Sequence, residues 1–359
     1  MLTYIIRRIL LMFPTLIGIT LVVFFVMALS PGGVAGPQLF GGEMDSEQGR
    51  IMQEYYNSRY GLDKPIPIQY LNWLNQISPL GFEVIYEDGK RSLGSFGFKW
   101  PDLGDSFSKG RPVTTLYGEA LPVTLLLNGL SVPIIYLIAI FSGVYAAKHR
   151  GKAIDIVSGT SFLTLWSIPT IWSGVLLIGF LCSDKYLHWF PASGLSSVAA
   201  NYQPFLPHFA DTGFQVGWLL DRLWHLILPV FCLSYGSFAF ISKLTRASVL
   251  ENLSADFVRT ARAKGVTQKN ALWQHAFRNS LLPLITVAAT VIPGLLAGSI
   301  IVEKIFSIQG MGLLMVDAIF ARDRDLVLAG TLISGVITLI CILIADLCYA
   351  IVDPRVSYE

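Results

Sequence analysis

The sequence predicts an all-α membrane protein with six transmembrane helices. Hydrophobic residues make up 53% of the 359-residue chain and charged residues only 14%, and the mean hydropathy is +0.58. This composition lies outside the range of soluble globular domains. Six apolar stretches are long enough to cross about 30 Å of hydrocarbon, which takes about 20 helical residues. They are residues 9–29, 121–147, 156–181, 224–244, 281–302 and 326–345.

The first stretch predicts a retained helix. Arg7 and Arg8 precede it, as in a signal peptide, but the apolar core of a signal peptide is only about 7–15 residues long. Four other stretches contain a proline, and we expect kinks there because proline frees a backbone carbonyl group. These prolines are Pro133, Pro169, Pro229 and Pro293.

Lysine and arginine indicate the orientation, because short cytoplasmic loops are rich in them. They are concentrated in residues 1–8, 148–155, 245–280 and 346–359 and are sparser in the short loops between. Both termini are therefore predicted to be cytoplasmic. The net charge of +2 is too small to indicate a nucleic-acid partner.

Residues 31–120 are predicted to form a small extracytoplasmic subdomain between the first span (residues 1–30) and a five-helix core (residues 121–359). Within it the sequence predicts a helix that ends at Gly61 and a second helix from about Ile68. The stretch VIYEDGKRSLGSF favours a β-hairpin, because an Asp-Gly pair lies between residues suited to strands.

Residues 254–280 predict a helical hairpin on the cytoplasmic surface. Ser254 would cap a first helix with Asp256 in its first turn, and Gly265 would end it. Thr267 would cap a second helix that continues until Pro283 opens the next span.

One face of the first hairpin helix has the composition of a docking surface. Phe257, Ala261 and Gly265 recur at a spacing of four, so they share a face on which small residues allow close approach. Three basic residues surround it, namely Arg259, Arg262 and Lys264. The alternative is that these basic residues only follow the positive-inside rule and contact lipid headgroups.

Sequence blocks in order along nearly the whole chain resemble permease subunits of binding-protein-dependent ABC importers, of the dipeptide and oligopeptide group. The blocks are IIRRIL, SPGG, YGLDKPIPIQYLNWL, LGDSF, LPVTLLL, SIPTIW, HLILPV, LTRASVLE, DFVRTARAKG followed by LLP, VEKIFSIQGMGLL and YAIVDPR. The chain departs from the generic loop, which begins Glu-Ala-Ala, by having Arg259, Thr260 and Ala261 there. Residues 81–101 look like extra length, as in the subgroup that imports oligopeptides and peptide-nucleotide antibiotics.

The resemblance implies a type I importer fold and a coupling helix that binds a groove of a cytoplasmic ATPase. Its residues here would be Asp256, Phe257, Arg259, Thr260, Ala261, Arg262, Ala263, Lys264 and Gly265. The implied partners are a homologous second permease, two ATPase domains, separate or fused, and an extracytoplasmic peptide-binding protein. The implied location is a bacterial inner membrane, whose lipid surrounds the spans. This chain has no G-x-x-x-x-G-K-[ST] stretch, the loop that binds the phosphates of ATP. We therefore expect that this chain binds no cofactor and that ATP-Mg binds to the partner ATPase.

Residues 303–325 are too short, and too mixed in polar and apolar residues, to span the membrane. They predict a short helix at the extracytoplasmic mouth of the protein. This helix would either dip back into the protein or lie in the membrane interface. In the family this segment lies near the translocation path. The candidate gate residues are therefore Phe306, Gln309 and Met311.

Two other classes of protein compete with the importer. A secondary transporter driven by an ion gradient would show internal repeats and acidic residues near mid-membrane. No clear repeat is present and no acid lies near the middle of any stretch, since Asp346 lies at the cytoplasmic end of the last one. A membrane-embedded hydrolase would need a nucleophile and base, and neither HExxH nor GxSxG is present. The four cysteines show no metal-ligand spacing.

Overall fold

The computed structural model describes residues 2–29, 61, 64–87, 90–210, 213–296 and 299–352. The chain divides into two compact units. The first unit consists of Ala120–Leu313 and Ile337–Glu359 with Met1, and the second of Leu2–Glu119 and Leu314–Val336. Three helices continue from one unit into the other: α4 (Val113–Lys148), α12 (Met311–Ala321) and α13 (Arg324–Val352).

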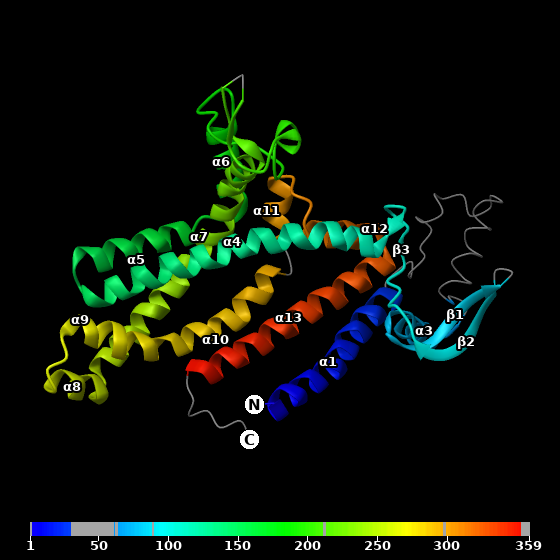
Figure 1. The fold of residues 1–359 in the computed structure, drawn as a ribbon, viewed down its shortest axis with the longest axis horizontal. Coiled ribbons are helices and arrows are strands. Elements are labelled where there is room, and N and C mark those ends of the chain that lie inside the picture. The colour runs from blue at the N-terminus through cyan, green and yellow to red at the C-terminus, as the bar shows by residue number, and fades with distance from the viewer. Residues whose placement is uncertain are drawn as a thin grey trace. The chain divides into compact units, whose positions relative to one another are not determined.

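The first unit is a helical bundle around α7 (Figure 1). Its further helices are α5 (Ala153–Trp166), α6 (Thr170–Leu177), a π-helix (Ile178–Cys182), α7 (Gly217–Ser254), α8 (Asp256–Ala263), α9 (Gln268–Asn270), a second π-helix (Ala271–Ala276), α10 (Phe277–Leu296) and α11 (Ile300–Ile305). Its loop before α7 holds a 3-10 turn (Ala199–Tyr202) and two short strands, β5 (His208–Ala210) and β6 (Gly213–Gln215).

Helix α7 packs closely because its neighbours present small side chains. A Cβ atom added to Gly143 of α4 would lie 2.6 Å from the Ser242 carbonyl oxygen and from Thr245 Cβ of α7. Only glycine permits that approach, as is common between helices in membranes. One core cluster lies where α4, α7 and α10 meet, and its buried members are Ile135, Ala139, Tyr235, Phe238, Ile241 and Leu284.

The second unit combines α1 (Leu2–Leu29) with the segment that precedes α4. That segment contains α3 (Ile66–Ile77), an antiparallel hairpin of β1 (Leu80–Glu87) and β2 (Lys90–Phe98), and two short strands, β3 (Asp105–Ser106) and β4 (Arg111–Pro112). The predicted hairpin and the helix near Ile68 are confirmed. The helix predicted to end at Gly61 lies outside the described residues.

Asp323 joins the LGDSF turn to the start of α13 in this unit. The side chain of Asp323 is fully buried, and its Oδ2 accepts hydrogen bonds from Ser106 Oγ (2.6 Å), Ser108 Oγ (2.8 Å) and the Ser108 backbone N–H (3.1 Å). Its Oδ1 accepts the Leu326 N–H at 3.3 Å, so the same carboxylate caps α13.

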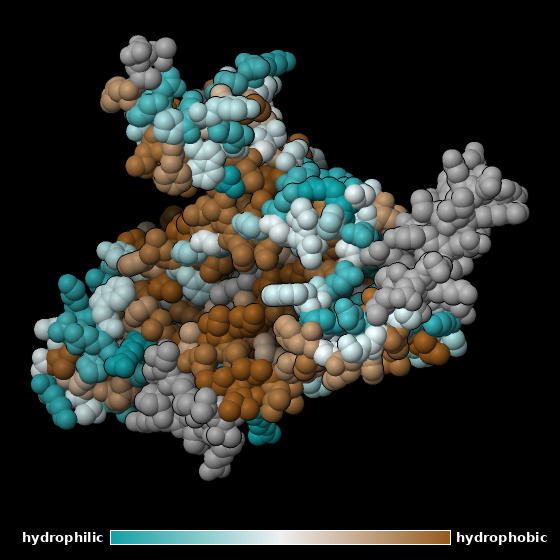
Figure 2. Space-filling model, turned by 45° about the vertical axis from the view of Figure 1, so that its right-hand side comes forward, coloured by the Kyte–Doolittle hydropathy of each residue, from teal (hydrophilic) through white to brown (hydrophobic). Residues whose placement is uncertain are grey.

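Four helices in the described residues are long and apolar enough to cross a membrane: Ile5–Leu29, Val113–Lys148, Gly217–Ser254 and Arg324–Cys348. A fifth span requires α5 and α6 to act together, although they bend by 89°. The bend lies at the predicted proline, because Pro169 is the N-cap of α6. The predicted stretch 281–302 overlaps α10, which ends at Leu296, so the count of six stays a prediction. Figure 2 shows hydrophobic residues over much of the visible surface, as expected of helices that face lipid.

Candidate functional site

The predicted hairpin of residues 254–280 forms directly after α7 (Figure 1). Its first arm is α8, and its second arm runs from α9 through the π-helix into α10. The Gly265 N–H bonds the Arg262 carbonyl (3.0 Å) and the Val266 N–H bonds the Ala261 carbonyl (3.2 Å), which is a Schellman end. Gly265 has φ +89°, a conformation that glycine adopts without strain. The predicted helix stop at Gly265 is therefore confirmed.

The predicted cap at Ser254 is wrong, and so is the prediction that a new helix opens at Pro283. Ser254 is the last residue of α7, with its Oγ bonded to the Glu251 carbonyl, and Ala255 stands at the N-cap of α8. Helix α10 continues past Pro283 to Leu296. The predicted cap at Thr267 is correct, since its side chain accepts the Asn270 N–H.

A small apolar core holds the two arms together. Val258 of α8 is 1% exposed and lies against Ala271 and Ala276 of the second arm, with Val266 in the turn beside them. The second arm in turn packs on α4 and α7 through Leu272, and Trp273 completes that cluster. Helix α8 is therefore the outer layer of the hairpin. A displacement of α8 would be transmitted to α7 and α10 through these packed side chains.

Eight of the nine predicted coupling residues are exposed at this outer layer, namely Asp256, Phe257, Arg259, Thr260, Arg262, Ala263, Lys264 and Gly265. The exception is Ala261, which is 9% exposed and turned toward the inside of the hairpin. The predicted docking face with Ala261 at its centre is therefore incorrect in detail. The exposed face runs from Phe257 to Gly265 and carries the basic side chains.

An ion pair ties the α4–α5 turn to α7 at the same end of the first unit. Arg246 Nε lies 2.5 Å from Asp155 Oδ1 and Arg246 Nη2 lies 2.7 Å from Asp155 Oδ2, and Asp155 also accepts the Gly151 N–H at 2.9 Å. The side chains are 33% and 10% exposed, respectively. Such a two-point pair fixes the orientation of both partners. The two charges are the only sign of this pair in the sequence.

We expect Arg246→Met to lower the free energy of unfolding by about 2 kcal/mol, because it leaves Asp155 partly buried without its cation. Lys243→Met, one turn earlier on α7 and exposed, should change it by less than about 0.5 kcal/mol. Thermal unfolding of the purified chain in detergent measures both. Equal effects of the two variants, or no coupling in a cycle with Asp155→Asn, would show that the pair contributes nothing.

The candidate gate segment is organised by a buried carboxylate. Glu303 of α11 is fully buried, and its Oε2 accepts the Leu313 N–H (2.7 Å) at the start of α12. The Met311 N–H is bonded to Thr124 Oγ1 at 2.9 Å. Negative charge is favourable at a helix N-terminus, so Glu303 positions the loop that precedes α12.

Of the three candidate gate residues, only Gln309 is exposed. Phe306 and Met311 are each 2% exposed, and Phe306 packs in an apolar cluster with residues of α4 and α7. Their side chains therefore face the interior of the first unit in this conformation. Sequence reasoning missed Glu303 as the residue that positions them, and the only signal was an acid beside an apolar stretch.

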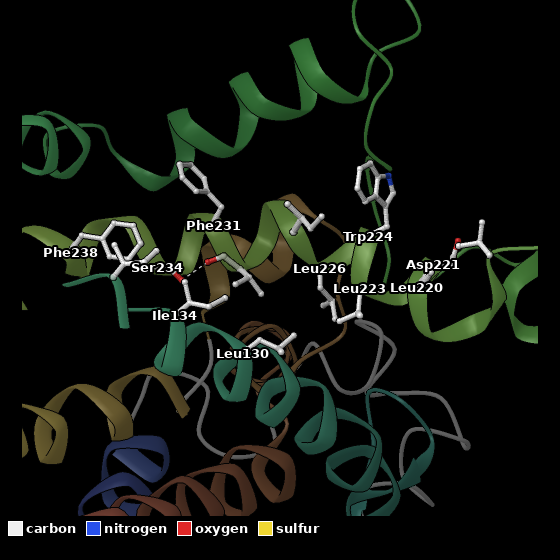
Figure 3. Close-up of a pocket in the computed structure, with 14 residues that line it drawn as sticks. Leu130, Ile134, Leu220, Asp221, Leu223, Trp224, Leu226, Phe231, Ser234 and Phe238 are labelled. Atoms are coloured by element: carbon white, nitrogen blue, oxygen red, sulfur yellow. Dashed lines mark hydrogen bonds between the residues drawn. The ribbon is translucent and has the colours of Figure 1, made fainter. Parts of the chain in front are cut away.

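A groove of the first unit lies between α4 and α7 (Figure 3) and has a volume of about 770 Å³. Its lining is apolar except for Asp221 and Ser234. Ser234 Oγ donates to the Val230 carbonyl (2.6 Å), and Asp221 Oδ2 accepts the Ser197 N–H (2.8 Å). With its polar groups already bonded, this groove suits hydrocarbon and offers nothing to a peptide backbone.

The family model described as "binding-protein-dependent transport system inner membrane component" matches residues 139–358, and the model of the N-terminal part of such components matches residues 1–128. The chain belongs to this family. It is therefore a multispanning inner-membrane transport component with the type I ABC importer permease fold.

Similar proteins match over their full lengths. The oligopeptide transport system permease protein AppB of Bacillus subtilis is 37% identical over 359 residues, which is 100% of both chains. The inner membrane ABC transporter permease protein YejB of Escherichia coli O157:H7 is 32% identical over 390 residues, 99% of each chain. The di/tripeptide transport system permease protein DppB of Pseudomonas aeruginosa is 31% identical over 368 residues, 100% of each. The family resemblance stated from the sequence is confirmed.

Proposed function

We propose that this membrane component is the permease subunit of an ATP-driven peptide importer, that it forms half of the translocation path, and that the 254–280 hairpin couples it to cytoplasmic ATPase subunits. The observation that carries the proposal is the end-to-end match to permeases of oligopeptide and di/tripeptide transport systems. The exposed, basic α8 supports the coupling role, because guanidinium and ammonium groups form strong bonds to carboxylates of a partner surface.

The proposal implies partners and an orientation. ATP is hydrolysed by a partner, since this chain carries no phosphate-binding loop. A second, homologous permease completes the path, an extracytoplasmic binding protein delivers the peptide, and lipid surrounds the spans. The concentration of lysine and arginine in the hairpin and near both chain ends supports cytoplasmic termini.

The test is peptide uptake by vesicles that contain this chain, its second permease, the ATPase subunits and the binding protein. Uptake should require ATP on the side of the membrane that carries the ATPase subunits. It should continue when proton and sodium gradients are dissipated. A complex without this chain is the control and should not transport. Uptake that follows an ion gradient, and that needs no ATPase, would replace the proposal with a secondary transporter.

A further inference from the structure

The β1–β2 hairpin of the second unit has its small side chains inside and its aromatic side chains outside. Gly81 is buried against α3, where a Cβ atom would lie 2.5 Å from Asn75 Oδ1. Asn75 also bonds the backbone of Phe82 twice, through Oδ1 (2.8 Å) and Nδ2 (2.9 Å). Polar and glycine contacts thus attach the hairpin to α3, and its apolar face points away from that helix.

We call this outward surface the aromatic face. Cross-strand neighbours share a face of the sheet, and the register pairs Leu80 with Phe98, Phe82 with Phe96 and Val84 with Leu93. A bulge lies between the last two pairs, and it keeps Leu93 on the same face as Phe96. These six residues are all apolar. Phe96 is 67% exposed, Phe98 73% and the adjoining Trp100 86%.

Helix α3 fixes the depth of this hairpin relative to α1. Its buried side packs on residues of α1 between Val23 and Ala28, and the Tyr70 hydroxyl bonds the Ile17 carbonyl (3.0 Å) and Thr20 Oγ1 (3.1 Å). The apolar run Ile5–Leu29 holds 25 residues, or about 37 Å of helix. That slightly exceeds the hydrocarbon thickness of about 30 Å. Residues 23–28 therefore lie at the boundary between acyl chains and headgroups.

The outer surface of α3 is also apolar at this depth. Ile68 is 43% exposed and Leu71 is 60% exposed. Two of its polar side chains are bonded within the unit: Asn75 bonds the backbone of Phe82, and Gln69 Nε2 bonds the Lys64 carbonyl at 2.9 Å. An element with bonded polar groups inside and apolar groups outside is the arrangement expected in lipid rather than in water.

We propose that α3 and the β1–β2 hairpin form a lipid-binding module, with Ile68, Leu71 and the aromatic face inserted into the leaflet that surrounds the C-terminal end of α1. In the predicted orientation this is the outer leaflet. Exposed aromatic residues are enriched at that level of membrane proteins. The module is continuous with α1, whose side chains Leu10, Val22 and Val26 are also exposed and apolar.

The test uses spin labels on the reconstituted permease complex. The four native cysteines are replaced by alanine, and one label is placed at Phe96→Cys or Phe98→Cys. The control is Ser95→Cys, an exposed neighbour in the bulge that lies outside the residue pairs of the aromatic face. In nanodiscs of phosphatidylethanolamine and phosphatidylglycerol, accessibility to oxygen and to nickel-EDDA is measured for each label. Gel filtration confirms that each variant is folded, as expected for exposed positions.

Insertion predicts that the oxygen-to-nickel accessibility ratio is at least about threefold higher at Phe96 and Phe98 than at Ser95, since these side chains would lie within about 5–10 Å of the interface. Equal, nickel-accessible labels at all three positions would overturn the proposal. Labels that become protected only after the extracytoplasmic binding protein is added would also overturn it, and would assign the aromatic face to protein docking.

Discussion

Gly265→Trp should reduce ATP-driven peptide uptake by at least about 100-fold, which corresponds to about 3 kcal/mol of lost coupling. In the chain itself a Cβ atom added at Gly265 meets nothing within 4 Å, so the position is open to a partner that approaches α8 closely, and the indole would obstruct that partner. The φ of +89° adds a strain of about 1–2 kcal/mol for any non-glycine residue. Uptake in vesicles and co-purification of the ATPase measure the effect.

Two controls separate docking from folding. Gly265→Asn keeps a small side chain that tolerates the helix-end conformation better than most, and it should retain most of the uptake. Arg262→Glu on the exposed face should weaken ATPase binding, whereas Lys269→Glu, equally exposed on the second arm, should not. Normal uptake by Gly265→Trp would rule out the hairpin as the coupling element.

Gly310→Ala should lower the free energy of unfolding by about 3 kcal/mol and impair transport. The new Cβ would lie 2.5 Å from Glu303 Cδ and 2.6 Å from its Oε1. Because Glu303 is fully buried and bonded to the Leu313 N–H, it cannot move without losing that bond. Overpacking costs about 1–3 kcal/mol, and a buried donor that loses its acceptor costs about 1–3 kcal/mol. Thermal unfolding and uptake measure the two consequences.

The matched control is Gly236→Ala in the same unit. Gly236 lies in α7, with nothing within 4 Å of an added Cβ, so alanine there should be neutral or slightly stabilising. Adding Glu303→Asp to Gly310→Ala shortens the carboxylate side chain and should recover part of the stability. If Gly310→Ala and Gly236→Ala behave alike, Glu303 does not constrain the α11–α12 loop as described.

The sequence was informative wherever a local rule decides the structure. Length and apolarity predicted the long helices, and the Asp-Gly pair predicted the β1–β2 hairpin, because turn and helix chemistry act within a few residues. Gly265 predicted the end of α8 for the same reason, since a positive φ favours glycine wherever it occurs. The family resemblance was also present in the sequence alone.

Local rules failed where packing chose between alternatives. Ser254 has the chemistry of a cap, but α7 extends through it. Ala261 shares a spacing with Phe257, yet the core around Val258 turns it inward. Helical spacing predicts which residues share a face of a helix. It does not predict which face another segment will cover.

What the sequence determined by itself is the class of protein, its main apolar helices and the position of the 254–280 hairpin. Only the tertiary structure decided which charged side chains bond to other parts of the chain. Glu303, Asp323 and the Asp155–Arg246 pair each meet a partner that is distant in the sequence or fixed by the fold. A buried charge is stable only when other segments supply its hydrogen bonds, and that condition is set by chain packing in three dimensions.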